Sequence, residues 1–353
     1  YNRQFINGML RGELGFDGVV NSDTGVLSAM AWGAEEFSKA GRAARVLRAG
    51  TDLVSGEDDP APFLEAIRKG FVDRETVDRA VCRLLTELFR LGLFEDPYTD
   101  ETAADALVNT EESRAAAYRA HQKSVVALKN KGALLPLTSE KLAGKKVYVE
   151  MMMRTDYTEE ELQAMALSGS GADPKETIAA FAGAVRKDHP DWTFTDDYRD
   201  ADVAILLLKP TSGSYFEATK SYLELNVCRE TGIDVDHIRA VREAVPHVVM
   251  HVNLNLPYLL TNVEPMADAL TVGFDTFTKA ALDVISGAAP AQGRLPITLP
   301  GSDAAIAVDE NGICASPNDV PGYDKHKYMK NGLTYAYRDA LGNEYRYGFG
   351  LTF

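Results

Sequence analysis

Two short apolar runs of this sequence carry carboxylates at positions where they could do chemistry. Residues 18–23 (GVVNSD) end at Asp23, and residues 51–55 contain Asp52. In parallel α/β folds, ligands bind beyond the carboxyl ends of the strands. A carboxylate there is accessible, yet close enough to the low-dielectric sheet to act strongly on a developing cation. Asp23 is therefore a candidate catalytic carboxylate, with an N-cap of the following helix as the alternative. For Asp52, a turn or capping role is favoured over one at the pocket.

The other residue types that commonly do chemistry lack the spacing of a metal or disulfide site. Three widely separated cysteines suit neither a disulfide framework nor a zinc cluster. The six histidines show no metal-ligand spacing. The glycine-rich residues 168–172 lack the strand–Gly-x-Gly-x-x-Gly–helix context of nucleotide binding. A nucleotide-binding α/β protein is therefore disfavoured.

Composition narrows the class of protein further. The 353 residues are 45% apolar and 25% charged, as in globular proteins, and are enough for two domains. A net charge of −15 argues against a nucleic-acid partner, because phosphate binding needs clustered Lys and Arg. The longest apolar stretches, such as residues 203–208, are far shorter than the ~20 residues of a membrane-spanning helix. The chain begins at Tyr1, so we expect any targeting segment to lie upstream, and the compartment is left open.

The elements that must position Asp23 form an α/β pattern over residues 1–98. Helices are expected at residues 5–14, 34–49 and 74–90, the last with apolar residues at helical spacing. They alternate with the two short runs, which predicts parallel strands covered by helices. Two strands are too few for an independent sheet, so we expect this segment to belong to a larger α/β body.

A second α/β pattern follows a linker, residues 99–140, that contains a helix at 111–130. Residues 141–300 are expected to form a sandwich domain around a mainly parallel sheet, and residues 301–353 a tail that wraps the surface. The strands are expected at residues 145–151, 202–208, 247–253 and 269–273, and the helices at 175–187, 234–244 and 276–286.

Several segments in a fixed order resemble glycoside hydrolase family 3. Residues 10–23 (LRGELGFDGVVNSD) resemble the segment that carries the nucleophile of this family on the seventh strand of a (β/α)8 barrel. Further matches lie at the eighth strand, the barrel exit, the entry to the second domain, its late strand and the closing segment. They read AGTDL at 49–53, LGLFEDPY at 91–98, SVVALKNKGALLPL at 124–137, GRLPITLP at 293–300 and YGFGL at 347–351. The resemblance implies the C-terminal strands of a TIM-type barrel followed by an α/β sandwich domain.

The same resemblance implies a retaining exo-β-glycosidase, most simply a β-glucosidase, that needs no cofactor or metal. Two carboxyl groups roughly 5 to 5.5 Å apart would act by double displacement on a β-linked oligosaccharide or glycoside. Asp23 would be the nucleophile. Residues 213–225 (GSYFEATKSYLEL) resemble the family loop that carries the acid/base, which maps to Glu217. Glu224 is the competitor, and its alternation with two leucines is expected to point it at solvent or a partner strand.

One departure from the family pattern concerns the leaving-group subsite. Thr24 stands where the family usually places a Trp that can stack on the sugar. Thr24 and Tyr215 are the candidate substrate-binding residues. Trp32 and Trp192 are expected to pack structurally, with a place for Trp32 at the pocket as the alternative.

The earlier strands of a family barrel are not in this sequence. An unclosed barrel leaves an unpaired apolar edge. We therefore expect a cleaved, split or truncated enzyme whose N-terminal barrel fragment is a second polypeptide. The alternatives are a catalytically silent carbohydrate-binding or regulatory subunit, or a β-xylosidase or N-acetyl-β-glucosaminidase of the same family.

Overall fold

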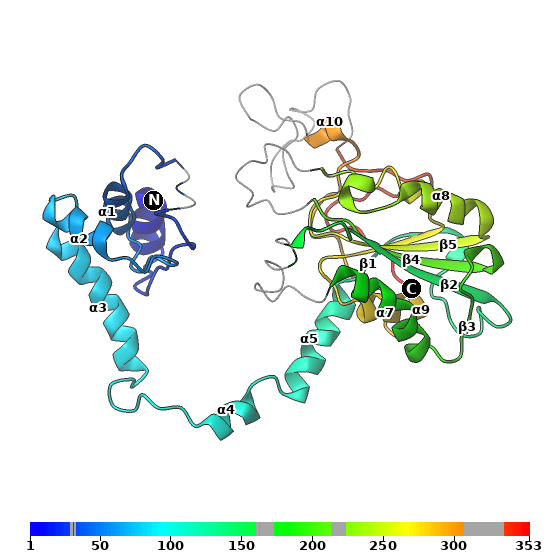
Figure 1. Ribbon diagram of the computed structural model, residues 1–353, viewed down its shortest axis with the longest axis horizontal. Helices are drawn as coiled ribbons and strands as arrows, with labels where there is room; N and C mark the ends of the chain where they lie inside the picture. The colour runs from blue at the N-terminus through cyan, green and yellow to red at the C-terminus, as the bar shows by residue number, and fades with distance from the viewer. Residues whose placement is uncertain (29–30, 32, 160–161, 163–172, 213–223, 307–334) are drawn as a thin grey trace. The chain divides into compact units, whose positions relative to one another are not determined.

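The computed structural model describes the chain in two compact units, Tyr1–Val108 and Asn109–Phe353 (Figure 1). The described residues are 1–353 apart from 29–30, 32, 160–161, 163–172, 213–223 and 307–334. None of the helices in the described ranges combines the length and apolarity needed to cross a bilayer.

The first unit is mainly helical. The helix expected at residues 5–14 is present as a π-helix, η1 (Gln4–Glu13), and Gly15 follows it with a φ of 70°. The helix expected within residues 34–49 begins only at Lys39, because the hydroxyl of Ser38 accepts a hydrogen bond from the Gly41 amide and caps it. The helices of this unit are α1 (Lys39–Ala49), α2 (Ala61–Arg68), α3 (Arg74–Arg90) and α4 (Glu101–Leu107).

The two expected strands of this unit lie side by side and run parallel. Asn21 and Leu53 form an isolated parallel bridge. The Ser22 amide donates to the Leu53 carbonyl at 2.8 Å, and the Asp52 amide donates to the Val20 carbonyl at 2.8 Å. The direction of the pair agrees with the prediction, although the regular pairing is limited to one bridge.

Much of the apolar surface of the first unit is uncovered. Helix α3 carries the predicted apolar stripe, yet Val81, Leu85 and Leu88 are 45%, 39% and 37% exposed. Larger apolar side chains around it are exposed as well, among them Phe89, Leu91 and Phe94. An exposed apolar surface of this extent usually marks an interaction site.

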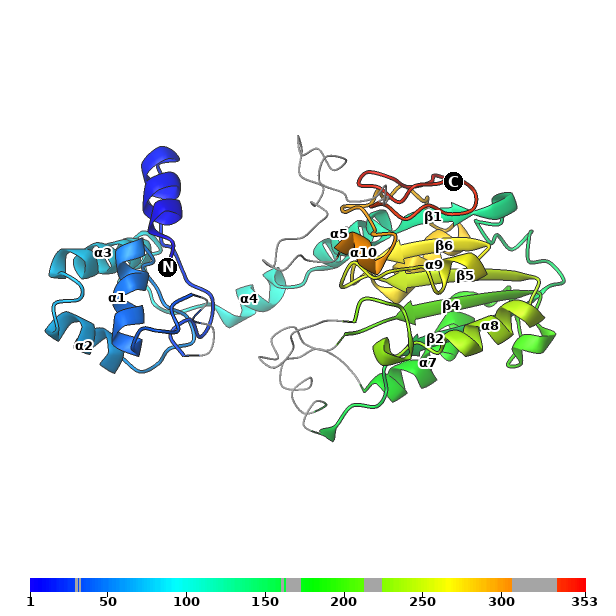
Figure 2. The same cartoon turned by 90° about the horizontal axis from the view of Figure 1, so that it is seen from above.

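The second unit is built on a six-stranded sheet with the order β1-β6-β5-β4-β2-β3, which can be followed in Figure 2 from β1 to β2. All neighbours are parallel except β1 and β6. The predicted, mainly parallel α/β architecture is therefore confirmed. The strands are β1 (Val126–Asn130), β2 (Lys146–Met153), β3 (Thr193–Phe194), β4 (Val203–Lys209), β5 (His247–Asn253) and β6 (Ala269–Gly273).

Helices cover both faces of this sheet. Alternate residues of β4 point to opposite faces, so Leu206 packs in one apolar cluster and Ile205 in the other. Helix α8 (Val235–Ala244) contributes to the first cluster, and α7 (Pro174–Asp188) and α9 (Thr278–Ser286) contribute to the second. The remaining helical segments are α5 (Glu111–Ser124), α10 (Asp303–Ile306), η2 (Lys131–Ala133), η3 (Tyr198–Asp200), η4 (Arg229–Thr231) and η5 (Glu264–Met266).

The prediction of a helix at residues 111–130 is wrong over its last third. Helix α5 ends at Ser124, and the following residues form β1, which pairs antiparallel with β6. Val126, Ala127 and Leu128 are completely buried. The sheet offers these apolar residues an edge with free backbone groups, and pairing there buries more of them than another helical turn would.

The C-terminal residues return to the same sheet edge. Leu351 forms an antiparallel bridge with Ala127. Tyr345 is fully buried among the side chains of the first cluster, and its hydroxyl lies 3.2 Å from Asp339 Oδ2. Burial raises the pKa of this hydroxyl, so it stays protonated and donates to the carboxylate.

We predict that buried His251 makes the second unit less stable in mild acid. Burial lowers the pKa of His251 to about 3, with a smaller effect from the charge of Lys209. Above about pH 6.5 the ring is neutral in both folded and unfolded states. As the pH falls below that value, the unfolded chain gains a proton that the folded chain cannot bind, so stability falls by about 2 kcal/mol at pH 5.

Urea unfolding between pH 5 and pH 8, followed by the fluorescence of tryptophan, measures this effect. His251→Gln should flatten the pH dependence, whereas His247→Gln, at the exposed start of β5, should leave it unchanged. Parallel curves for the wild type and His251→Gln would contradict the assignment.

Candidate active site

Asp23 lies directly beyond the paired segment of the first unit and is exposed. Its carboxylate accepts a hydrogen bond from the Thr24 amide at 2.7 Å. The preceding Ser22 is tied to the neighbouring segment, because its Oγ accepts from the Ser55 amide at 3.0 Å. The candidate nucleophile is thus an accessible carboxylate on a backbone that is held to residues 53–55 by hydrogen bonds.

Asp52 is the buried anchor of this arrangement. Its side chain is 1% exposed and forms ion pairs with Arg11 Nη2 at 2.6 Å and Arg83 Nη1 at 2.8 Å. It also accepts a hydrogen bond from the Val20 amide at 2.9 Å. Asp52 therefore does more than the expected turn or capping role: its carboxylate links η1, α3 and the segment that leads to Asp23.

A single arginine organises the loop that follows Asp23. The guanidinium of Arg42 on α1 donates to the carbonyl oxygens of Ala34, Leu27 and Glu35 at 2.9, 2.8 and 2.9 Å. These three carbonyls belong to the chain between Asp23 and α1. Sequence reasoning missed Arg42, because an arginine in a helix has no pattern that distinguishes it from a surface residue.

More polar groups surround the end of the paired segment. Ser55 Oγ donates to Asn21 Oδ1 at 2.8 Å, and Ser28 Oγ donates to Glu57 Oε1. Asn21, Ser28 and Glu57 were not predicted, although Asn21 lies within the first apolar run and Ser28 and Glu57 follow the two runs. Position beyond a strand end was the signal that could have found them.

Thr24 is exposed and lies close to Gly56. A side chain at Gly56 would place its Cβ 2.5 Å from Thr24 Cγ2 and 3.1 Å from the Gly25 amide nitrogen. Gly56 also has a φ of 69°, which disfavours other residues. The backbone of residue 56 therefore packs closely against Thr24.

Three predicted residues lie outside the described residues: Glu217, Tyr215 and Trp32. The competitor Glu224 is described, and its Oε1 accepts hydrogen bonds from the Asn226 amide at 2.7 Å and from Asn226 Nδ2 at 2.8 Å. The carboxylate of Glu224 is thus engaged in a local turn.

The carboxyl edge of the second sheet carries a polar group that the sequence analysis missed. Asn253 Nδ2 donates to Asp275 Oδ1 at 2.9 Å, and Asn253 Oδ1 is buried without a partner in the described part of the chain. Lys209, the last residue of β4, is largely buried. Burial lowers the pKa of its amine, and the charge of Asp275 opposes that shift. These residues come from the ends of β4, β5 and β6, so they lie at one edge of the sheet.

Trp192 and several histidines outside this group are engaged in packing or hydrogen bonds. Trp192 is 6% exposed and stacks on His189 at 4.1 Å between ring centroids, as the expected packing role requires. His237 Nε2 lies 2.8 Å from Glu150 Oε2, and His121 stacks on Phe277. Among the residues whose positions are given, no group of three or more His, Cys, Asp or Glu side chains could hold a metal ion.

Comparison with known protein families identifies the class of protein. The glycosyl hydrolase family 3 N terminal domain matches residues 1–87, and the glycosyl hydrolase family 3 C-terminal domain matches residues 125–353. The chain therefore belongs to glycosyl hydrolase family 3.

Individual relatives agree with this membership. The chain is 28% identical over 355 residues to Beta-glucosidase C of Emericella nidulans, a match that covers 96% of this chain and 50% of the relative. It is 26% identical over 329 residues to a periplasmic beta-glucosidase/beta-xylosidase of Dickeya chrysanthemi, covering 87% of this chain and 45% of the relative. The chain thus spans about half the length of these curated relatives.

A solved structure has the same fold. The beta-glucosidase from Listeria innocua in complex with glucose matches with a TM-score of 0.68 and 23% identity, over 100% of this chain and 49% of that one. The barrel plus α/β sandwich architecture of family 3 therefore describes the fold class, as the sequence predicted.

We predict that Asp52→Asn destabilises the segment that carries Asp23. The substitution removes two ion pairs and leaves Arg11, whose side chain is 9% exposed, without its carboxylate. Breaking a buried pair from one side costs about 3–5 kcal/mol. Hydrogen exchange of peptides that cover residues 18–28 and 50–56 should accelerate accordingly.

Asp78→Asn serves as the matched control, since Asp78 forms an exposed i, i+4 pair with Arg74. An exposed pair of this kind contributes only about 0–0.5 kcal/mol. Equal protection in wild type and Asp52→Asn would show that the anchor does not hold these segments together.

Proposed function

We propose that this chain forms part of a retaining exo-β-glycosidase, with β-glucosidase as the leading activity. Membership of family 3 and relatives named as beta-glucosidases support this activity. A relative named beta-glucosidase/beta-xylosidase keeps β-xylosidase as the alternative. The observation that carries the proposal is the exposed carboxylate of Asp23, which follows a segment held in parallel register with residues 51–55.

In the proposed mechanism, Asp23 is the nucleophile and Glu217 is the general acid/base. A carboxylate oxygen of Asp23 attacks the anomeric carbon while the glycosidic C–O bond breaks, and Glu217 gives its proton to the leaving oxygen. The product of this step is a glycosyl ester of Asp23. Water then attacks the anomeric carbon and gives a proton to Glu217, which releases the sugar with retained configuration and restores both carboxyl groups.

Thr24 and Tyr215 are proposed to contact the substrate. Thr24 adjoins the nucleophile, and it is exposed while its methyl group lies close to Gly56. A threonine offers a hydroxyl but no aromatic face, so leaving-group recognition in this chain would rely less on stacking than in relatives with a Trp there.

The domain assignment follows from the family and is also a proposal. Residues 1–98 would supply strands 7 and 8 of a TIM-type barrel, and residues 99–140 the linker with its helix. Residues 141–300 would form the sandwich domain and residues 301–353 the wrapping tail. The family domain matches at 1–87 and 125–353 are compatible with this division.

We propose that the rest of a family barrel covers the apolar surface of the first unit. The uncovered stripe of α3 at Val81, Leu85 and Leu88 would be buried in a closed barrel, where outer helices pack on strands. The span of about half of the relatives' length agrees with this need for a further barrel segment. A second polypeptide is the proposed source.

A catalytically silent carbohydrate-binding or regulatory subunit is the second candidate. Thr24, in place of the family's usual Trp, favours it, because a subunit without turnover has no need for a leaving-group subsite. Loss or retention of turnover on changing Asp23 separates the two functions.

We predict that Asp23→Asn lowers kcat for an aryl β-glucoside by at least about 10³-fold, because the amide cannot form the glycosyl ester. Sugar binding should persist. A 2-deoxy-2-fluoroglycoside with a good leaving group should label the peptide that contains Asp23, and mass spectrometry of the digest measures this label.

The control is Asp58→Asn, which removes another exposed carboxylate of the same unit and should leave kcat unchanged. The assay uses the complete enzyme, with its polypeptides identified by denaturing mass spectrometry. Unchanged turnover in Asp23→Asn would refute the nucleophile, and full activity of a single 38.5 kDa species would refute the partner.

We predict that Glu217→Gly slows substrates with poor leaving groups far more than those with good ones, since only the former need a proton donor. Added azide should restore the rate and yield a β-glycosyl azide, because a small anion fits the space left by the carboxylate and needs no general base. Product analysis by NMR measures this outcome. Glu224→Gly is the matched control and should show no azide effect; azide rescue of this variant would make Glu224 the acid/base instead.

A further inference from the structure

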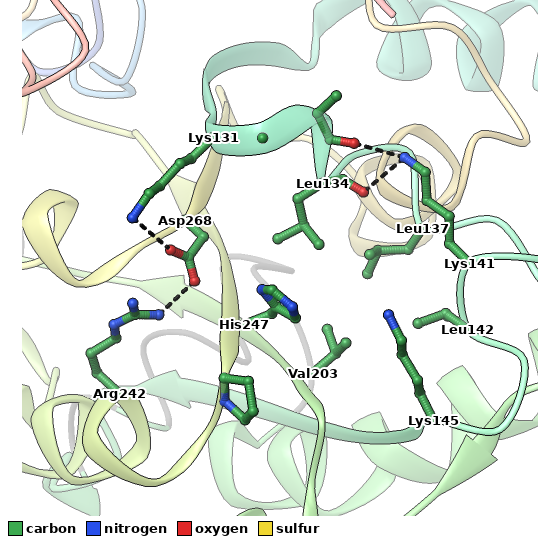
Figure 3. Close-up of a pocket in the computed structure, with 13 residues that line it drawn as sticks. Lys131, Leu134, Leu137, Lys141, Leu142, Lys145, Val203, Arg242, His247 and Asp268 are labelled. Atoms are coloured by element: carbon green, nitrogen blue, oxygen red, sulfur yellow. Dashed lines mark hydrogen bonds and ion pairs between the residues drawn. The ribbon is translucent and has the colours of Figure 1, made fainter.

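A basic pocket of about 450 Å³ lies at the edge of the second sheet where its parallel strands begin (Figure 3). Lys145 precedes β2, Val203 begins β4, His247 begins β5 and Asp268 precedes β6. Lys131 reaches the same edge because β1 runs antiparallel to β6 and ends there. The residues that would carry the acid/base follow the opposite end of β4, which spans about 20 Å at ~3.3 Å per residue. The pocket therefore lies at the opposite edge of the sheet from Lys209 and Asn253, which end β4 and β5.

The pocket has a clear excess of positive charge. It is lined by four cationic side chains, Lys131, Lys141, Lys145 and Arg242, and by one carboxylate, Asp268. That leaves three positive charges in excess, within a chain whose net charge is −15. A local reversal of sign of this kind attracts anions that the rest of the surface repels.

The carboxylate in the pocket is already engaged. Asp268 Oδ2 pairs with Arg242 and accepts from the Val248 amide at 3.1 Å, and its Oδ1 lies 3.9 Å from Lys131 Nζ. Figure 3 shows Arg242 and Lys131 meeting at Asp268 on one side of the pocket, with the His247 ring facing its interior. Asp268 thus has little capacity to neutralise the lysines opposite.

Within the described residues, Lys141 and Lys145 have no carboxylate partner. Lys141 Nζ donates to the carbonyl oxygens of Ala133 and Leu134 at 2.7 and 3.2 Å. Lys145 is half-buried, extends into the pocket in Figure 3, and its Nζ has no hydrogen-bond or ion-pair partner within the described ranges. An ammonium in a pocket that already holds two other cations would be stabilised by a bound anion, through a charge-assisted hydrogen bond.

Helix geometry accounts for only one of the four cations. Arg242 lies in the last turn of α8, where a positive side chain complements the helix dipole. Lys131, Lys141 and Lys145 come from the turn after β1 and the loop before β2. Their convergence therefore needs another explanation.

We propose that this pocket binds a small phosphate-bearing anion. Lysines act on phosphate as point charges from several directions, as these three do, whereas a planar carboxylate is better matched by an arginine fork. The volume lies in the range of small-molecule sites, and Leu137, Leu142 and Val203 line it with apolar surface for the carbon part of an ester. Free phosphate and a sugar phosphate share this chemistry.

Isothermal titration of the full chain with inorganic phosphate, and separately with a hexose monophosphate, tests the proposal. We expect saturable binding at one site, weakened about tenfold or more by Lys145→Gln, which removes one charge-assisted hydrogen bond. Lys175→Gln, at an exposed lysine in the first turn of α7, should leave the affinity within about twofold of wild type. Lys131→Gln gives a second variant at the pocket and should also weaken binding.

The two titrants separate the possible sources of the anion. Tighter binding of the hexose monophosphate indicates that the apolar wall takes part, and equal affinities indicate recognition of the phosphate group alone. Absence of saturation with both titrants, or an affinity that Lys145→Gln and Lys131→Gln leave unchanged, would overturn the proposal. Circular dichroism of each variant confirms that its fold is retained.

Discussion

The geometry of the first unit depends on one buried carboxylate. Asp52 draws Arg11 from η1 and Arg83 from α3 to the same point and accepts the amide of Val20. Because charges of this kind are costly to bury unless every partner is in place, the three elements are held in one arrangement. Asp23 follows Val20 by three residues, so its position beyond the paired segment is a consequence of this anchor.

The two edges of the second sheet have different chemistry. At the carboxyl edge, Lys209, Asn253 and Asp275 lie where β4, β5 and β6 end. At the amino edge, lysines converge on a pocket that has an excess of positive charge. The apolar clusters on both faces hold the strands between these edges, so the sheet presents two separate sets of polar groups.

The first unit differs from this well-packed sheet because much of its apolar surface is uncovered. In the second unit most residues of β1, β4, β5 and β6 are buried, whereas α3 in the first unit keeps its apolar stripe accessible. Among the described residues, the candidate nucleophile Asp23 is exposed, whereas a glycosidase site excludes water when it closes. The proposed barrel partner would supply that enclosure.

By itself, the sequence determined several of the longest elements and singled out Asp23 as the candidate nucleophile. Local periodicity predicted α3 and β5 at their observed bounds, because a helix or a buried strand follows from side-chain spacing alone. Only the tertiary structure decided that residues 126–130 form a strand, since that choice depends on the open edge of β6. It alone also decided that Asp52 is an anchor, since the arginines that pair with Asp52 lie 41 and 31 residues away in the sequence. The sequence could not predict the basic pocket either. Its lysines come together only because the end of the antiparallel strand β1 lies beside the starts of the parallel strands.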